Sequence, residues 1–418
     1  MLDRLRATDA NTRWLMAVVA VLAVVAVPFL VSGPGNDLDV ANTFRSGRSI
    51  ARHGTYLPSR APGAPVHESL VGILDLAAGP LATNLASLLV AIALLIGLDR
   101  LLAGEGLGRS RRWAVALVAA NPWFIIAATS TVDYLFALAF VIWAAVALRR
   151  GHPVVAGLLA AAAMGSRVTT AVMVLALLVA ELTEPTRVGT SSDQPDAEDD
   201  LDDGRPAAVP RRRSTTLVVV TAAVASVATL VLFIPSIVEA GGLAFAQNDF
   251  STASPLVHLG RAAVKDLTLL GPITWLVVLL AVPAVFAALR HWRTSWLVRF
   301  SIPALILSQV LFVRFPWKIS HLLPCLVLGA ILLAVALRDR SQLLIALVVL
   351  QVIFGLVQVQ VVEPNSPNQA TGGRVALAVD WGPLVIDWRC RQDHHDAYLG
   401  RQKVEVEAAW TCAQPFGQ

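Results

Sequence analysis

Two aspartates and a row of arginines stand close together between the first two long apolar runs of the chain. Asp37 and Asp39 open a stretch whose apolar residues recur at the spacing of one helix face. Beside that face, basic residues follow at spacings of three and four, namely Arg45, Arg48 and Arg52. A positioned carboxylate can act as a general base, and arginine binds phosphate by paired, charge-assisted hydrogen bonds. The pattern predicts a surface helix that holds a phosphorylated substrate beside a general base.

The same residues also fit a purely structural role. Helices that lie in a bilayer interface bind lipid headgroups through their basic face, and aspartates at a helix start cap its first turn. The residue pattern leaves these two interpretations open.

Other polar residues lie near the ends of later apolar runs. Arg167 is either a phosphate ligand that faces a cavity or an interfacial residue whose charge reaches the headgroups. Asp133 either holds an acceptor hydroxyl or a metal, or caps a helix next to Thr131. Arg314 and Lys318 flank the sequence FPW and either close over a phosphate or contact headgroups. The remaining candidates for substrate contact are Arg60, Glu68 and His321.

Composition identifies the elements that must position these residues. Of 418 residues, 56% are hydrophobic and only 15% are charged, whereas soluble domains carry roughly 25% charged residues. The chain is therefore predicted to be an all-α, polytopic integral membrane protein with surface helices in its first outer loop. Apolar runs of about 17–25 residues cross a bilayer as helices, and about eleven are expected. They lie at residues 14–32, 72–98, 113–130, 133–148, 153–165, 168–183, 215–235, 267–289, 297–313, 319–337 and 341–361.

Orientation follows from the 33 lysines and arginines, most of which fall in the inner loops when the N-terminus is cytoplasmic. This places the acid pair and the C-terminal tail outside, in a multi-pass plasma-membrane protein. Residues 153–183 could instead form one long helix, which would invert every later span. We expect two helices broken at GSRVTT, because Arg167 in mid-membrane would cost about 2.5–3.5 kcal/mol. Inversion would also place the basic sequences PRRR and RHWR outside.

We place the transmembrane domain at residues 1–361. One segment inside this domain and one segment after it differ from the rest in composition. The acidic stretch 188–210 is typical of a disordered cytoplasmic linker. Residues 362–418 form an extracytoplasmic tail, whose Cys390 and Cys412 are expected to form a disulfide in an oxidising compartment. The DHHD sequence in this tail lacks a further ligand at helical spacing, which argues against a metal site there.

Taken in order, these segments resemble the polytopic glycosyltransferases of the C superfamily, which include protein O-mannosyltransferases and aminoarabinose transferases. The similarity covers residues 14–340. It is carried by the acid pair after the first span and by the segments HGTYLPSRAPGAPVHE, NPWFIIAATSTVDYLFALAF, AGLLAAAAMGSRVTT and FPWKISHLLP. The chain departs from the family in its Asp-Leu-Asp pair, where Asp-Glu is common in some members, and in His321, where Tyr is common.

The resemblance implies inverting transfer of a sugar from a polyprenyl-phosphate or polyprenyl-diphosphate donor at the extracytoplasmic face, onto a glycan, lipid or protein acceptor. It implies Asp37 as the leading candidate base and Asp39 as a residue that orients substrate or helps to bind a divalent cation such as Mg²⁺ or Mn²⁺. Members of the superfamily differ in metal dependence, so no cofactor is assigned. Residues for the donor phosphate come from the pool Arg45, Arg48, Arg52, Arg60, Arg167, Arg314 and Lys318.

Two other classes of protein share this composition. A secondary transporter or lipid flippase would place charges or broken helices near the bilayer midplane and show internal repeats, whereas the charges here stand at the outer surface. A membrane scaffold that binds partners through its tail leaves the first loop unexplained. Membrane lipids are expected partners, and nucleic acid is not, because the net charge of +4 is spread over the loops.

Overall fold

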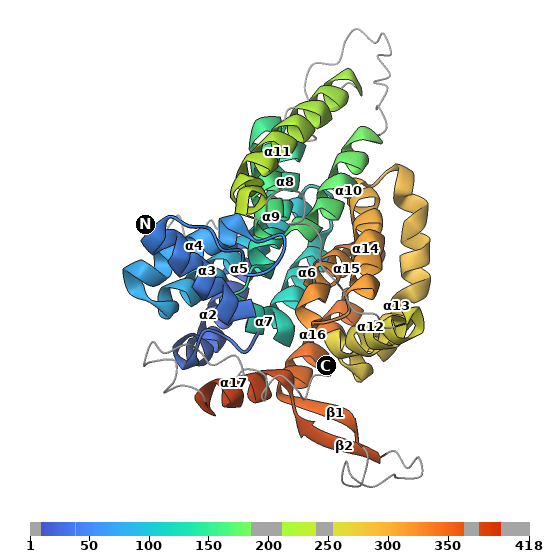
Figure 1. The fold of residues 1–418 in the computed structure, drawn as a ribbon. Helices are drawn as coiled ribbons and strands as arrows, with labels where there is room; N and C mark the ends of the chain where they lie inside the picture. Colours follow the sequence, from blue (N-terminus) through green and yellow to red (C-terminus); the bar gives the residue numbers. More distant parts are fainter. Residues whose placement is uncertain (1–9, 38, 185–210, 240–253, 363–375, 394–418) are drawn as a thin grey trace, which may run out of the picture.

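The computed structural model describes residues 10–37, 39–184, 211–239, 254–362 and 376–393, and helices dominate these ranges (Figure 1). Two strands, β1 (Val357–Val362) and β2 (Ala376–Trp381), form an antiparallel hairpin. In chain order the helical elements are α2 (Ala10–Ser32), α3 (Asp39–His53), α4 (Pro65–Ala78), α5 (Pro80–Ala103), α6 (Gly108–Ala120), α7 (Pro122–Ala128), α8 (Tyr134–Arg149), α9 (Pro153–Ser166), η1 (Val168–Thr170), α10 (Ala171–Leu182), α11 (Arg211–Glu239), α12 (Pro255–Leu270), α13 (Pro272–Leu289), η3 (Arg290–Arg293), α14 (Trp296–Arg314), η4 (Ile319–Leu322), α15 (Leu323–Ala336), α16 (Ser341–Leu356) and α17 (Pro383–Asp393).

The faces of these helices fit a protein that lies in a bilayer. Within the described ranges, six helical segments are long and apolar enough to cross a membrane, and shorter apolar helices lie among them. Leu94 of α5 and Leu138 of α8 are fully buried in the core, whereas Val24 of α2, Leu230 of α11 and Leu280 of α13 are largely exposed. Such exposed apolar side chains can face lipid tails, which are as apolar as leucine. The predicted all-α, multi-pass fold class is confirmed, while the number of eleven spans stays a prediction.

The second and last expected spans have different ends from those predicted. Residues 72–98 are divided between α4 and α5, because Gly79 adopts a positive φ of 73° and Pro80 begins the next helix. The expected span 341–361 is wrong at its end, since α16 stops at Leu356. The alternating sequence VQVQVV that follows forms β1, because β-branched residues at every second position favour a strand.

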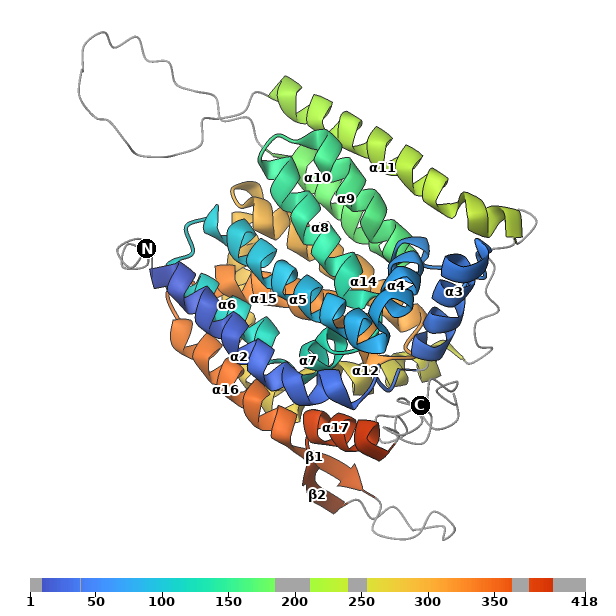
Figure 2. The same cartoon turned by 90° about the vertical axis from the view of Figure 1, so that its left-hand side faces the viewer.

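The chain breaks at GSRVTT, as predicted. α9 ends at Ser166, and Arg167 takes an extended backbone with φ −158° and ψ 109° before α10 begins. Arg149 at the end of α8 lies 3.6 Å from Glu181 near the end of α10, whereas Arg167 lies against Asp133 at the start of α8. α8 and α10 therefore run in the same direction, and α9 returns beside α8 and α11 (Figure 2). We call the end of the bundle that holds Asp133 and Arg167 the site end.

α3 and α4 form a helical hairpin at the site end (Figure 2). α3 corresponds to the predicted surface helix, and its buried residues include Val40, Phe44 and Gly47, on the face that the sequence indicates. The two helices cross closely, because a Cβ on Gly72 would lie only 2.1 Å from the carbonyl oxygen of Gly47. This contact fixes α3 against α4, and with it the position of Asp39 in the first turn of α3.

Candidate active site

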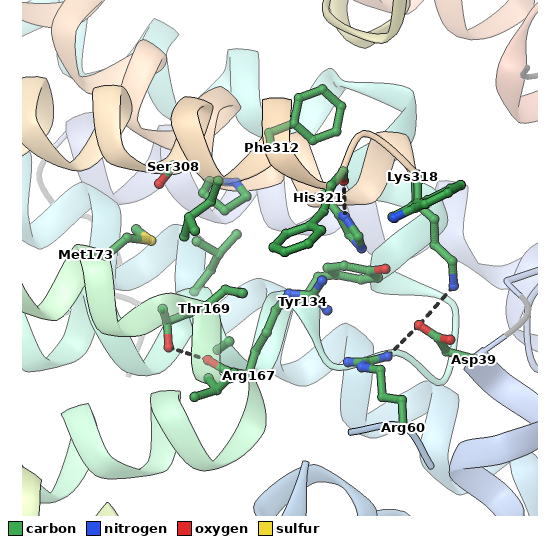
Figure 3. A pocket seen from close by; sticks show the side chains of 18 of the residues that line it. Asp39, Arg60, Tyr134, Arg167, Thr169, Met173, Ser308, Phe312, Lys318 and His321 are labelled. Atoms are coloured by element: carbon green, nitrogen blue, oxygen red, sulfur yellow. Dashed lines mark hydrogen bonds and ion pairs between the residues drawn. The ribbon is translucent and has the colours of Figure 1, made fainter. Parts of the chain in front are cut away.

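A network of ion pairs joins five separate parts of the chain at the site end, and Figure 3 shows the part of this network around Asp39. The Arg60 guanidinium binds the carboxylates of both Asp39 and Asp133. Arg167 also binds Asp133, with 3.1 Å between its Nη1 and Oδ1. The Nζ of Lys318 lies 2.9 Å from Oδ2 of Asp39, so that Asp39 lies between two cations. The network thereby connects α3, the first loop, the start of α8, the break between α9 and α10, and the loop after α14.

Asp37 arranges the first turn of α3. Its Oδ1 accepts a hydrogen bond from the backbone N–H of Asp39 at 2.8 Å, and its carbonyl oxygen accepts one from Val40 at 3.0 Å. The same carboxylate also binds the Nζ of Lys318. Asp37 therefore caps the helix, as one interpretation of the sequence expected, and it contributes a second carboxylate to the ion-pair network.

The network determines the ionisation of its members. Burial alone would raise the pKa of Asp39, but the charges of Arg60 and Lys318 outweigh it and hold that pKa well below its usual range. Burial alone would lower the pKa of Lys318, and the neighbouring Asp37 carboxylate reverses this and raises the pKa above its usual value. The described cluster opposes three cations to three carboxylates, which are Arg60, Arg167 and Lys318 against Asp37, Asp39 and Asp133.

The network borders a cavity of about 560 Å³, which lies within the roughly 300–1,000 Å³ typical of small-molecule sites. Asp39, Arg60 and Lys318 line its polar end. Its other end is lined by apolar side chains from α8, α10 and α14, among them Met173 and Phe312 (Figure 3). The cavity can therefore take a ligand that has an anionic group at one end and an apolar chain at the other.

Three ring and guanidinium groups lie between the two ends of the cavity (Figure 3). The Arg167 guanidinium lies over the Tyr134 ring, 4.3 Å from its centroid, which is a cation–π contact. The centroids of the Tyr134 and His321 rings are 5.6 Å apart. These contacts hold Arg167 where the polar lining meets the apolar lining.

Comparison with known proteins identifies the fold. No family model matches the sequence, and no curated protein matches it either. The structure of ArnT from Cupriavidus metallidurans bound to undecaprenyl phosphate is similar with a TM-score of 0.55 and 18% identity, over 97% of this chain and 76% of that chain. The chain therefore shares the fold of that ArnT structure. The fold expected from the sequence resemblance is thereby confirmed.

Two further structures are similar over a smaller share of their own length. Apo ArnT from the same organism gives a TM-score of 0.48 at 19% identity, over 79% of this chain and 60% of that chain. The oligosaccharyltransferase of Archaeoglobus fulgidus, tethered with an acceptor peptide, gives 0.49 at 14% identity, over 79% and 50%. The chain thus spans half of the length of that oligosaccharyltransferase.

Most of the residues singled out from the sequence lie together at this site. Asp133 does not cap α8 with its side chain, which was one of its two interpretations. Its carboxylate makes no cap hydrogen bond and binds two guanidinium groups instead. The candidates that the structure brings together are Asp37, Asp39, Arg60, Asp133, Arg167, Lys318 and His321.

The basic face of α3 lies away from the cavity. Arg45 and Arg52 are exposed, and the Nε of Arg48 lies 2.6 Å from Asp75 of α4. None of the three lines the cavity. The buried face of α3 packs on α4, so the adjacent basic face cannot also turn toward the ion-pair network. These arginines therefore lie outside the cavity lining, and their part in holding a phosphate stays a prediction.

Arg314 and Glu68 also stand outside the cavity lining. Arg314 is exposed, and its guanidinium lies 5.4 Å from the centroid of the Phe315 ring. Glu68 is fully buried, and its Oε1 accepts a hydrogen bond from the Ser59 N–H at 3.0 Å. Glu68 therefore orders the first loop near Arg60, and its contact with a substrate stays a prediction.

Sequence reasoning missed Tyr134 and Lys265. Tyr134 directly follows the candidate acid Asp133, and this adjacency is the feature of the sequence that could have identified it. Lys265 of α12 donates a hydrogen bond to the carbonyl oxygen of Trp317, and it thereby supports the turn before Lys318. These partners are 52 residues apart in sequence, and no local pattern indicates such a pairing.

Several sequence-based expectations concern residues at the edge of the described ranges or beyond them. Cys390 is disulfide-bonded, but Cys412 lies outside the described residues, so their pairing stays a prediction. The linker 188–210 and the last three residues of DHHD also lie outside. Among the described residues, no group of three or more His, Cys, Asp or Glu side chains can hold a metal ion. The described part of the chain thus assigns no ligand set to the divalent cation considered above.

Proposed function

We propose that the chain is a plasma-membrane glycosyltransferase that moves a sugar from a polyprenyl-phosphate-linked donor to an acceptor at the extracytoplasmic face, with inversion. The observation that carries this proposal is the cavity that joins an apolar end to a polar end lined by Arg60, Arg167 and Lys318. Such a cavity suits a phosphate attached to a long hydrocarbon chain. The ArnT structure with the same fold is bound to undecaprenyl phosphate, a molecule that has both parts.

Arg60, Arg167 and Lys318 are the proposed ligands of the donor phosphate, because each is held near the polar end of the cavity by a carboxylate. A phosphate that enters competes with Asp39 for Arg60 and Lys318. As Asp39 loses these partners, its pKa rises toward the ordinary value of about 3.9. The carboxylate then remains ionised at neutral pH and becomes a stronger proton acceptor.

In the proposed reaction, the acceptor oxygen attacks the anomeric carbon while the bond from that carbon to the phosphate oxygen breaks. The bonding electron pair leaves with the lipid phosphate, whose charge the three cations stabilise. The acceptor proton passes to a carboxylate, which we assign to Asp39 because Asp39 lines the cavity. Asp37 supports it by capping its N–H. This assignment exchanges the roles that the sequence resemblance suggested for the two acids.

The test is whether the purified full chain, in nanodiscs, consumes labelled polyprenyl-phosphate sugars in the presence of candidate glycan, lipid and protein acceptors. The expected result is release of the lipid phosphate together with a new glycosidic product. Arg60→Gln should raise the donor KM at least about tenfold, since a hydrogen bond to a charged group contributes roughly 1.5–3 kcal/mol. Arg45→Gln is the matched control, because Arg45 is exposed and does not line the cavity. Equal effects of both changes would contradict the assignment of the phosphate site.

A lipid flippase is the second candidate, because the same cavity suits the binding of an amphipathic lipid phosphate. Vesicles that hold the protein and labelled donor, but no acceptor, separate the two functions. A flippase moves the donor between leaflets with its sugar–phosphate bond intact. A transferase leaves the donor in its leaflet and cleaves it after an acceptor is added.

A further inference from the structure

α17 covers part of the site end, where it packs against α2 and α7 (Figure 2). It follows the last apolar helix, yet the side chains of Asp387 and Arg391 are only 6% and 1% exposed. The Nε of Arg391 lies 2.8 Å from Oδ2 of Asp387. Removing one partner of such a buried pair leaves an uncompensated charge, which is costly. α17 therefore carries its ion pair inside the protein rather than on its surface.

The rest of the Arg391 guanidinium binds two segments that are far apart in sequence. Its Nη1 donates to the carbonyl oxygens of Phe29 at 3.2 Å and Gly33 at 3.3 Å, at the end of α2. The same Nη1 donates to the carbonyl oxygen of Thr129 at 2.8 Å, and Nη2 donates to Oγ of Ser130 at 2.8 Å. One side chain thus joins the end of α2 to the turn after α7.

These two segments lead directly to the acids of the site. The first continues to Asp37, and the second continues to Asp133. They also touch each other, because the N–H of Thr131 donates to the carbonyl oxygen of Pro34 at 2.8 Å. The positions of Asp37 and Asp133 therefore depend on one contact region that Arg391 holds together.

Two further contacts leave this region little freedom. The Nδ2 of Asn36 donates to Oδ1 of Asp387 at 2.9 Å and to the Asp387 carbonyl oxygen at 3.1 Å. Gly35 has a φ of +108°, and a Cβ at this position would lie 2.5 Å from Oγ of Ser130. The residue before Asp37 is thus bound to α17, and the residue before that packs on the turn after α7.

We propose that Arg391 is a positioning residue, which sets the place of the acid pair Asp37 and Asp39 relative to Asp133 and Arg167. The consequence for transfer rests on the proposed function, whereas the geometric part does not. Without the guanidinium, the two segments lose their shared donor and Asp387 keeps a buried charge without its partner. Asp39 then shifts relative to the donor phosphate, and a misplacement of about 1 Å can cost about 10²-fold in rate.

Amide hydrogen exchange on the full chain in nanodiscs tests the geometry without any substrate. In Arg391→Gln, exchange should become faster in residues 33–37 and 129–133, while the core helix α5 keeps its protection. Arg389→Gln is the matched control on the same helix, because Arg389 is exposed and its guanidinium lies 4.6 Å from the centroid of the Trp381 ring. Unchanged exchange in both segments overturns the proposal.

A kinetic measurement tests the consequence for the reaction. The kcat of Arg391→Gln should fall about 10²-fold per folded molecule, and the donor KM should change far less, because the phosphate ligands remain. If the kcat of Arg391→Gln equals that of the wild type after correction for the fraction of folded protein, Arg391 only stabilises the fold. That result overturns the positioning role. If Arg391→Gln does not fold, Arg391→Lys takes its place, because lysine keeps a charge beside Asp387 but lacks the guanidinium that bonds both segments, and unchanged exchange in residues 33–37 and 129–133 then overturns the proposal. A wild-type chain that transfers no sugar refutes the proposed function, and the exchange result still decides the geometry.

Discussion

In the proposed reaction, Asp39 accepts a proton although it lies between two cations that favour its ionised form. Burial raises the pKa of Asp39, but the charges of Arg60 and Lys318 outweigh it and hold that pKa below the usual range. A donor phosphate would compete for the same two cations, so binding of the donor and the basicity of Asp39 are linked through shared partners. Such a link favours proton transfer when the donor is already in place.

Replacing each acid by asparagine should separate the two roles. We expect Asp39→Asn to lower kcat about 10²- to 10⁴-fold, the usual contribution of a positioned general base. Binding of polyprenyl phosphate should be at least as tight, because the phosphate no longer competes with a carboxylate at Asp39 for Arg60 and Lys318. Asp37→Asn should lose less, because asparagine keeps an oxygen that caps the N–H of Asp39. Steady-state rates and equilibrium binding measure both effects. The reverse order assigns the base to Asp37, and full activity of both variants removes this loop from the chemistry.

We expect the fall of kcat/KM on the acid side of its pH profile to occur only at low pH. Because the pKa of Asp39 is depressed, the carboxylate is ionised in the free protein down to pH values below the ordinary Asp value of about 3.9. The value of kcat/KM, which reports the free enzyme, should therefore not fall through protonation of Asp39 between pH 8 and 5. The profile of Asp37→Asn serves as the control. An acid limb near neutral pH that moves in Asp39→Glu would contradict the depressed pKa.

The residue types of the site could be predicted from the sequence, but their partners could not. Asp37 and Lys318 are 281 residues apart, and only the folded bundle brings them together. Arg48 stands at the right helical spacing for a basic face, yet its partner Asp75 lies 27 residues further along the chain. Periodicity describes one helix at a time, so it does not show which neighbour that helix packs against.

Among the elements, those with strong local signals were predicted best. The break at GSRVTT follows from a small-residue sequence and the cost of a mid-membrane arginine, and α3 follows from one apolar face. The end of α16 was missed although VQVQVV alternates with the period of a strand, because its valines also suit a transmembrane helix. Apolar composition alone therefore marks the spans but not their ends.

The crossing of α3 and α4 should tolerate no added methyl group. Gly72→Ala places a Cβ 2.1 Å from the Gly47 carbonyl oxygen, and overpacking of this kind typically costs about 1–3 kcal/mol. We expect a lower melting temperature in detergent and a lower rate of transfer, because α3 carries Asp39. Gly329→Ala in α15 is the control, since nothing lies within 4 Å of its added Cβ. Equal melting temperatures of the two variants would contradict the tight crossing.

At the scale of the whole molecule, the proposed location of the site depends on orientation. Single cysteines placed in 188–210 should be shielded from membrane-impermeant thiol reagents in intact cells, and cysteines in 365–375 should react, because basic residues favour the cytoplasmic side. Permeabilised cells, in which both sets react, provide the control. The reverse pattern would place the site end in the cytoplasm and remove the extracytoplasmic reaction from the proposal.

The connection between α10 and α11 divides the residues of the site between two halves of the chain. Asp39, Arg60 and Arg167 come from the first half, whereas Lys318 comes from the second. Close packing of α9 on α11 joins the halves, since a Cβ on Gly157 would lie 2.8 Å from the Thr221 carbonyl oxygen. Two polypeptides made by cutting the gene within 188–210 should each be inactive alone and should complement each other when co-expressed. Recovered transfer in co-expressing membranes, and its loss when Lys318 is replaced in the second half, would make this protein a two-component enzyme that can be switched on by assembly.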